Sequence, residues 1–336
     1  MNVVINTDNG DTFYLLPFLR QIYEKYGSCG YIFSISDPDA TTHYTKKKNL
    51  LYKILYEQPY ITKFGFVNKS FNRGYFYQNK YILEMQDLPD ISEVYFEKNN
   101  IETLDDTLMN CGTKGVKSLF QSPKVDFVPN FYFHPSDTST YIKPLSQLAV
   151  DRFGIGTCFN ERYLHLNSHE SLHDKKIAIG RSARYNENND IMKLLVDKLG
   201  KENFVFLGLS DEYKSFCENV ATVEYLETKD LLEVAQALNT VDLYIGNQSC
   251  IMAIAESLKL NIIQESSKRV PNCNFSKYRD NFYCVVKDND EIVFVNDSLN
   301  VDNKDFFGIQ LEKRPADYNF TVGDHKYPSK CYRIVQ

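Results

Sequence analysis

Tryptophan, long apolar runs, paired cysteines and an excess of basic residues are all missing from this chain of 336 residues. No stretch approaches the roughly 18 consecutive apolar residues of a membrane-spanning helix. The first six residues lack the basic segment and the apolar stretch of a secretory signal. The sequence therefore predicts a cytoplasmic protein without a membrane span. The formal net charge of −6 also argues against attachment to nucleic acid through bulk charge, although a local basic strip is compatible with it.

None of the eight cysteines forms a C-x-x-C pair, so zinc and redox motifs are unsupported. We expect reduced thiols, no bound metal and no cofactor. His165, His169 and His173 recur at four-residue spacing, which on a helix would suggest a metal site. Surface histidines in a polar linker are the favoured interpretation.

Length and composition predict two α/β domains with a normal hydrophobic core. We place an amino-terminal domain at residues 1–170 and a carboxy-terminal domain with an irregular tail at residues 174–336, joined by the polar segment 167–174. Tyrosine, phenylalanine, asparagine and lysine are abundant, as is typical of AT-rich genomes and therefore of many phages. This is a hint of a phage or environmental origin, in which case the host cytoplasm is the expected compartment.

The stretch from Val241 to Glu265 organises the chain. A short apolar run at Leu243–Ile245 predicts a buried parallel strand, and apolar residues from Ile251 follow at helical spacing. The polar turn between them then lies at the carboxyl end of a strand and the amino end of a helix, where α/β sheets bind anions. We therefore expect a nucleotide or phosphosugar site around Asn247–Cys250. The alternative is an ordinary turn in which Ser249 caps the helix.

The amino-terminal segment follows the same order of strand, polar loop, helix and strand. The strands are expected at Val3–Ile5 and Tyr31–Ile35, and the helix at Thr12–Tyr26. Pro17 falls inside the helical pattern, so the helix proper is expected to begin near it. Residues 38–140 read less clearly, with strands expected at Tyr60–Val67, Gly74–Leu83, Ser92–Phe96 and Asp126–Tyr132.

The second half alternates strands and helices as a doubly wound sheet requires. Arg181 and Arg184 follow the strand Lys176–Ile179, and paired guanidinium groups there suit a diphosphate; surface salt bridging is the alternative. Gly208 lets the chain turn closely after the next strand. Thr228 is expected to cap the helix Lys229–Leu238. A hairpin at residues 282–295 is expected, and the tail to Gln336 shows no clear period.

Two segments carry a resemblance to a known family. Gly10–Arg20, GDTFYLLPFLR, resembles the G-D-x-x-x-x-L-P-x-L-R pattern of the heptosyltransferase-like glycosyltransferases, carbohydrate-enzyme family nine. Asp242–Ser249, DLYIGNQS, resembles their D-L-x-I-G-N-D-S motif. The resemblance covers most of residues 1–30 and 174–266. It implies the GT-B architecture, two Rossmann-like domains facing a central cleft, and an inverting, metal-independent transfer from a nucleotide-diphosphate sugar that acts as co-substrate.

The resemblance assigns the general base to Asp11, for which a helix N-cap is the structural alternative. The expected donor-binding residues are Gly10, Arg181, Arg184, Gly208, Asn247, Gln248, Ser249, Cys250 and Glu256. Gln248 stands where the family often has aspartate, so the donor need not be a heptose. The family's G-x-x-H continuation is replaced by Cys250–Ala253. Glu256 is expected either to hold a ribose hydroxyl or to be a solvated helix residue.

The acceptor stays open between a glycan and a hydroxymethylated base in phage DNA. DNA would need a positive strip beside Asp11, for which the candidates are Lys46–Lys48, Lys114, Lys117 and Lys124. A non-catalytic nucleotide- or sugar-binding module on the same fold is the rival function, and an epimerase is a third. The sequence names neither the sugar, the nucleotide base nor the oligomeric state.

Overall fold

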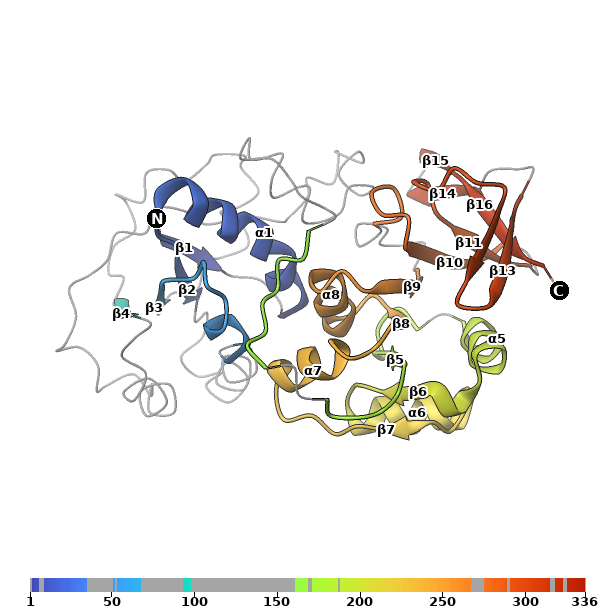
Figure 1. Cartoon of the computed structure of the whole chain (residues 1–336), viewed down its shortest axis with the longest axis horizontal. Coiled ribbons are helices and arrows are strands. Elements are labelled where there is room, and N and C mark those ends of the chain that lie inside the picture. Colours follow the sequence, from blue (N-terminus) through green and yellow to red (C-terminus); the bar gives the residue numbers. More distant parts are fainter. Residues whose placement is uncertain are drawn as a thin grey trace.

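The computed structural model has the α/β architecture that the sequence predicts; its two larger sheets share a central helix layer, and a two-stranded sheet lies near the carboxyl end (Figure 1). It describes residues 2–5, 9–34, 51, 53–67, 93–97, 161–168, 171–186, 188–266, 275–288, 291–314, 318–322 and 325–335. The expected strands Gly74–Leu83 and Asp126–Tyr132, His169, and the candidate DNA-binding lysines lie outside these residues. The domain boundary near residue 170 stays a prediction.

The amino-terminal sheet has the strand order β1-β2-β3-β4. Strands β1, β2 and β3 are parallel and β4 is antiparallel to β3. The bounds are β1 Asn2–Ile5, β2 Gly30–Ser34, β3 Lys63–Val67 and β4 Glu93–Glu97. All four fall within or close to strands expected from the sequence. Helix α1, Asn9–Tyr26, connects β1 to β2.

Helix α1 begins at Asn9 and runs through Pro17, so the expectation that it begins near Pro17 is wrong. Proline removes one backbone donor from a helix interior. Packing outweighs that loss here, because every residue from Thr12 to Leu19 is buried. Asp11 is consequently the third residue of α1 and not its N-cap.

The second sheet has ten strands in the order β12-β13-β16-β11-β10-β9-β8-β5-β6-β7. Six of them, β5 to β10, are mutually parallel and lie in the order β7-β6-β5-β8-β9-β10. Numbered from one along the chain, this is the 3-2-1-4-5-6 order of a dinucleotide-binding sheet. The bounds are β5 Ile177–Gly180, β6 Phe204–Phe206, β7 Glu224–Tyr225, β8 Leu243–Asn247, β9 Asn261–Glu265 and β10 Phe282–Asp288.

The helices of this half alternate with its strands. They are α5 Asn189–Leu199, the 3-10 turn η4 Lys201–Asn203, α6 Ser210–Asn219, α7 Leu231–Leu238 and α8 Cys250–Ser257. In the parts of the chain that the structure describes, no helix has the length and apolar character needed to cross a bilayer.

The tail is more regular than the sequence indicates. The predicted hairpin is present as β10 and β11, Glu291–Val295. Beyond it, β12 Asn303–Phe306, β13 Ile309–Lys313 and β16 Cys331–Ile334 extend the sheet in antiparallel fashion, and β14 Tyr318–Val322 pairs with β15 His325–Ser329.

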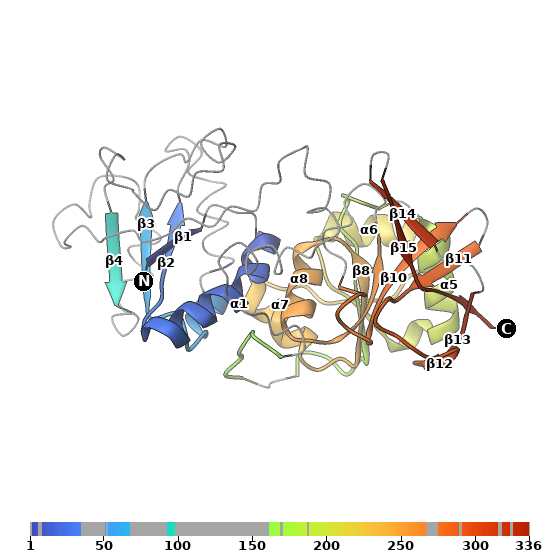
Figure 2. The ribbon, with the colours of Figure 1, turned by 90° about the horizontal axis from the view of Figure 1, so that it is seen from above.

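Both faces of the parallel strands are buried, because alternate side chains enter two different cores. Leu243 and Ile245 face one core, and Tyr244 between them faces the other. The core on the Tyr244 side also contains the apolar residues of α1, α7 and α8. Helix α1 therefore lies between the amino-terminal sheet and α8, as the view from above shows (Figure 2).

Helix α7 is capped by Asp230, so the expectation that Thr228 caps it is wrong. The Asp230 carboxylate accepts hydrogen bonds from the backbone N–H groups of Leu232 and Glu233, both at 3.0 Å. Its other oxygen lies 2.8 Å from the Lys53 Nζ, on a segment that precedes β3. One buried carboxylate thus caps the start of α7 and forms an ion pair with the amino-terminal half of the chain.

We expect Asp230→Ala to lower the free energy of unfolding by about 1–2 kcal/mol, because the first turn of α7 loses its acceptor. Thr228→Ala is the matched control and is expected to stay within about 0.5 kcal/mol of the wild type. Denaturant unfolding followed by circular dichroism measures both. Equal stability of the two variants would contradict the capping role of Asp230.

Candidate functional site

The order of the parallel strands places a candidate site between β5 and β8. From β5 the chain continues to β6 on one side, and from β8 it continues to β9 on the other side. Sheets of this type bind ligands outside the carboxyl ends of the two strands where the order reverses in this way. Gly180 ends β5 and pairs with Gly246 of β8. A Cβ on Gly246 would lie 2.2 Å from the Gly180 carbonyl oxygen and 2.3 Å from the Tyr244 hydroxyl oxygen. Only glycine fits this close approach.

Asn247 joins the two loops that leave these strands. Its side chain is fully buried. The Oδ1 atom accepts from the backbone N–H of Ser182 at 3.0 Å and from the Ser182 hydroxyl at 3.3 Å. The Nδ2 atom donates to the carbonyl oxygens of Ser182 at 2.8 Å and Arg184 at 2.6 Å. These four bonds use the capacity of the amide, so Asn247 positions the 182–184 loop.

Arg181 is held by a buried carboxylate. Its Nε lies 2.8 Å from Glu265 Oε2 and its Nη2 lies 2.9 Å from Glu265 Oε1, with both side chains 2% exposed. Glu265 Oε1 also accepts from the backbone N–H of Asn188 at 2.7 Å, and Asn188 caps α5. The surface salt bridge expected as an alternative is therefore wrong. The diphosphate role of Arg181 stays a prediction that its burial disfavours.

Arg184 differs from Arg181 because its side chain is exposed. Its guanidinium lies 6.0 Å from the centre of the Tyr185 ring, and Tyr185 has a positive φ of 58°. Of the two arginines expected at a diphosphate, Arg184 is the one whose charged group faces solvent beside the ends of β5 and β8.

Ser249 caps helix α8, as the structural alternative proposed. Its hydroxyl accepts from the backbone N–H of Met252 at 3.3 Å. The first turn of a helix carries four N–H groups that lack acceptors within the helix, and the helix dipole is positive at this end. The first turn of α8 therefore offers an anion-binding geometry next to Asn247.

Gln248, just before the cap, is buried. Burial also raises the pKa of Tyr244, whose hydroxyl donates to the Gly180 carbonyl at 3.2 Å.

The first turn of α1 lies against the first turn of α8. A Cβ on Gly10 would lie 3.3 Å from the Cys250 Cα and 3.8 Å from the Ser249 carbonyl oxygen. Further along, the Tyr14 hydroxyl contacts the Met252 sulfur at 3.6 Å. The structure thus brings the two sequence motifs together. Asp11 follows Gly10 in α1, and its side chain lies outside the described residues.

Two other residues predicted to bind the donor, Glu256 and Gly208, have structural roles. Glu256 sits near the far end of α8, is fully buried, and forms ion pairs with Lys259 and Arg279. The solvated-helix alternative is wrong, and the ribose role of Glu256 stays a prediction that its burial and its ion pairs disfavour. Gly208 follows β6, with φ at 156°, and a Cβ there would lie 2.9 Å from Glu212 Oε2. It allows the turn that the sequence predicts.

Sequence reasoning missed Glu265 and Tyr244. Glu265 is the last residue of β9, at the carboxyl edge of the parallel sheet, whereas Tyr244 lies within the apolar run of β8. The five cysteines within the described residues, Cys29, Cys217, Cys250, Cys284 and Cys331, form no disulfide, in agreement with the expected reduced thiols. His173 is half-buried; its Nδ1 accepts from the backbone N–H of Lys175 at 3.1 Å, so its Nε2 donates to the Ala237 carbonyl oxygen at 3.1 Å.

No protein-family model and no curated protein matches this sequence. Solved structures do resemble it. A glycosyl transferase family 9 protein from Veillonella parvula has 16% identity and a TM-score of 0.42 over 78% of this chain and 79% of its own. The iron-containing dodecameric glycosyltransferase TibC from enterotoxigenic E. coli has 12% identity and a TM-score of 0.46, over 84% of this chain and 61% of its own.

The E. coli heptosyltransferase WaaC, solved with ADP-2-deoxy-2-fluoro heptose, has 12% identity and a TM-score of 0.41 over 81% of this chain and 94% of its own. TM-scores and identities at this level assign neither an activity nor a substrate to this chain. Function is therefore inferred from the residues at the meeting point of α1, β5 and α8.

We expect Glu265→Gln to destabilise the protein by about 3–5 kcal/mol, because it leaves the buried guanidinium of Arg181 without its counter-charge. Glu312→Gln is the matched control: its partner Arg333 lies 2.9 Å away, but the two side chains are 43% and 52% exposed. That exposed pair is expected to change stability by about 1 kcal/mol or less. Urea unfolding of both variants tests the difference, and a similar small effect in each would refute the structural role of Glu265.

Proposed function

We propose that this chain is a glycosyltransferase that moves a sugar from a nucleotide-diphosphate sugar to an acceptor hydroxyl. The observation that carries the proposal is the contact of Gly10 with Ser249 and Cys250, which brings the first turn of α1 to the carboxyl edge of a 3-2-1-4-5-6 sheet, where such sheets bind ligands. The resemblance of both contacting segments to glycosyltransferase motifs supports the same activity.

The donor diphosphate is proposed to lie at the first turn of α8, where the positive end of the helix dipole and the direction of the backbone N–H groups favour an anion. Arg184 adds a guanidinium that suits a phosphate. Asn247 and the Arg181–Glu265 pair are not proposed to contact the donor. They hold the loop that carries Arg184 in position. Helix amino terminus and arginine together stabilise the charge of the departing nucleoside diphosphate, so the proposal needs no metal and no cofactor.

Asp11 is proposed as the general base. Its carboxylate takes the proton of the acceptor hydroxyl as that oxygen attacks the anomeric carbon, and the bond to the nucleoside diphosphate breaks on the opposite side. A single direct displacement of this kind inverts the anomeric carbon. The negative charge that develops on the leaving diphosphate is placed where the α8 dipole and Arg184 stabilise it.

The proposed acceptor is a glycan hydroxyl, because the net charge of −6 opposes attraction to DNA over the whole molecule. The hydroxymethylated base of phage DNA stays as the second candidate. Transfer assays with both acceptors decide between them: glycan labelling without DNA labelling supports the first, and the reverse result replaces it.

We expect Asp11→Asn to lower kcat by about 10²- to 10⁴-fold, the usual contribution of a general base, while nucleotide-diphosphate affinity stays unchanged. Glu24→Gln, on the exposed end of the same helix, is the control and is expected to retain full activity. Initial rates of sugar transfer and a thermal-shift titration measure the two quantities. Full activity in Asp11→Asn would remove Asp11 from the reaction.

We expect Arg184→Ala to weaken nucleotide-diphosphate binding by about 10- to 100-fold, the equivalent of one charge-assisted hydrogen bond. Arg333→Ala removes a similarly exposed arginine from the distant strand β16 and is expected to leave binding unchanged. A thermal-shift panel of nucleotide diphosphates and their sugars reports binding, since a ligand of the native state raises Tm. Binding without any transfer or sugar hydrolysis would favour the non-catalytic module instead.

A further inference from the structure

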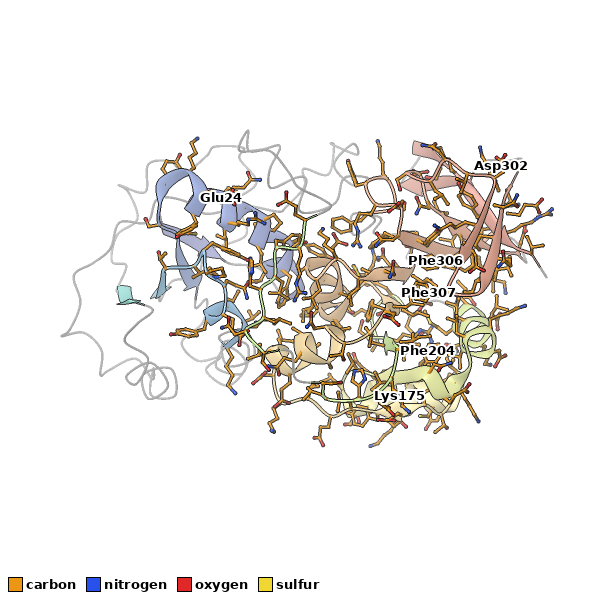
Figure 3. All side chains as sticks on the ribbon, in the orientation of Figure 1. Glu24, Lys175, Phe204, Asp302, Phe306 and Phe307 are labelled. Atoms are coloured by element: carbon orange, nitrogen blue, oxygen red, sulfur yellow. The ribbon has the colours of Figure 1, made fainter. Side chains whose placement is uncertain are left out.

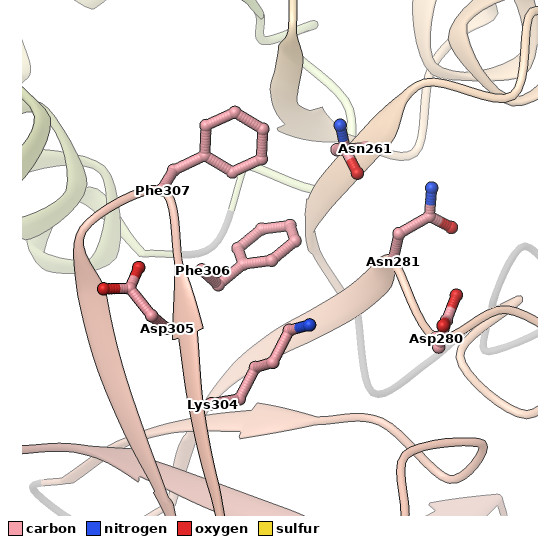
Figure 4. Close-up of a pocket in the computed structure, with 7 residues that line it drawn as sticks. All are labelled: Asn261, Asp280, Asn281, Lys304, Asp305, Phe306 and Phe307. Carbon is pink, nitrogen blue, oxygen red and sulfur yellow. The ribbon is translucent and has the colours of Figure 1, made fainter.

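A pocket of about 260 Å³ lies at the amino ends of strands β9 and β10, opposite the carboxyl ends at which the donor is proposed to bind. Its walls come from the start of β9, the turn before β10 and the β12–β13 hairpin (Figure 4). The lining residues are Asn261, Asp280, Asn281, Lys304, Asp305, Phe306 and Phe307. In Figure 3 the labelled Phe306 and Phe307 lie apart from Glu24, which marks α1. The pocket is smaller than the roughly 300–1,000 Å³ typical of drug-sized ligands.

One side of the pocket is aromatic. Phe306 is buried and its ring centre lies 4.4 Å from that of Tyr283 and 5.0 Å from that of Phe307. Phe307, in contrast, keeps 38% of its surface exposed. An aromatic ring that is partly open at a pocket edge offers an apolar face to a ligand.

Phe307 occupies a backbone position that disfavours its side chain. It forms the tip of a two-residue hairpin with Gly308, and φ is 56° at Phe307 and 82° at Gly308. Such turns normally carry asparagine, aspartate or glycine at the first position. Strained backbone positions of this kind are found at ligand sites, where another function retains the residue. Neither the turn nor the buried core accounts for an exposed phenylalanine here.

The other side of the pocket is polar. Asp280 is exposed, Asn281 and Asn261 are half-buried, and Figure 4 shows the Lys304 amine extended towards the side that carries Asp280 and Asn281. Asp305 faces its own hairpin, where Gly308 N–H donates to it at 2.8 Å. The pocket therefore combines one ammonium, two carboxylates and two amides. Two carboxylates against one cation disfavour an anionic ligand.

We propose that this pocket binds one unit of a neutral saccharide. A sugar ring has an apolar face that stacks on an aromatic side chain, and its hydroxyls both donate to carboxylates and accept from amides and amines. Phe307 supplies the stacking face, Asp280 the acceptor, and Asn281 with Lys304 the donors. The small volume of the pocket limits the ligand to about one ring.

The site is separate from the proposed transfer site and does not rest on it. Asn261 begins β9 and Glu265 ends it, so the two sites lie at opposite ends of the same strand, about 13 Å apart along it. Saccharide binding in this pocket is therefore independent of whether the chain transfers a sugar at the carboxyl ends of the strands.

Saturation-transfer NMR with the full chain and glucose, galactose, mannose or N-acetylglucosamine tests the proposal. We expect at least one of these sugars to bind the wild type, and saturating nucleoside diphosphate to leave that binding unchanged. No binding by any of the four sugars overturns the proposal. Displacement by nucleoside diphosphate also overturns it, because the signal then belongs to the transfer site. Stronger binding of glucuronate than of glucose contradicts a neutral ligand.

The Phe307→Asn variant separates a ligand role from a structural one. It removes the ring but places a favoured residue in the turn, so saccharide binding should weaken by about tenfold or more while Tm stays equal or rises. Phe307→Tyr keeps the ring and should keep binding. Tyr26→Ala, which removes an exposed aromatic from α1, is the control and should bind normally. Unchanged saccharide binding in Phe307→Asn would contradict the proposal. A Tm of Phe307→Asn well below that of Tyr26→Ala would also contradict it, because Phe307 would then have a structural role.

Discussion

The packing of α1 on α8 is the constraint on which the rest of the arrangement depends. It brings an amino-terminal segment and a segment more than 200 residues later into one core, with Gly10 directly over Ser249 and Cys250. A side chain at position 10 would press on the α8 backbone, so the missing Cβ sets how closely the two first turns approach. Every functional role proposed for Asp11 follows from that approach and from the helix register it fixes.

Around this contact, buried polar groups shape the loops and leave few groups for a ligand. Glu265 holds Arg181 and the start of α5, and Asn247 holds the 182–184 loop. Breaking such buried pairs is costly, since one charge then stays without compensation. The network therefore gives the loop a defined shape before any ligand binds, and leaves the Arg184 side chain exposed next to the half-buried first turn of α8. Pre-formed geometry of this kind lowers the entropic cost of binding.

The sequence predicted the parallel sheet and its loops well, because apolar runs such as Leu243–Ile245 and polar turns such as Gly246–Ser249 are local signals. It failed where a long-range partner decides the outcome. Pro17 lies inside a helix because every residue from Thr12 to Leu19 is buried, and Glu256 is paired with Arg279 from a later segment. The strands β12, β13 and β16 were missed because exposed residues interrupt their alternation, as in the Asn303–Phe306 stretch, and their pairing is antiparallel with distant strands.

The shared core of α1 and α8 also bears on how the chain is made. Helix α1 is synthesised more than 200 residues before α8, the helix that covers part of its apolar surface. At about 5–20 residues per second, that surface waits roughly 10–50 s for its partner. Nascent chains of this protein are therefore candidates for chaperone capture during translation, and fragments that end before α8 should aggregate.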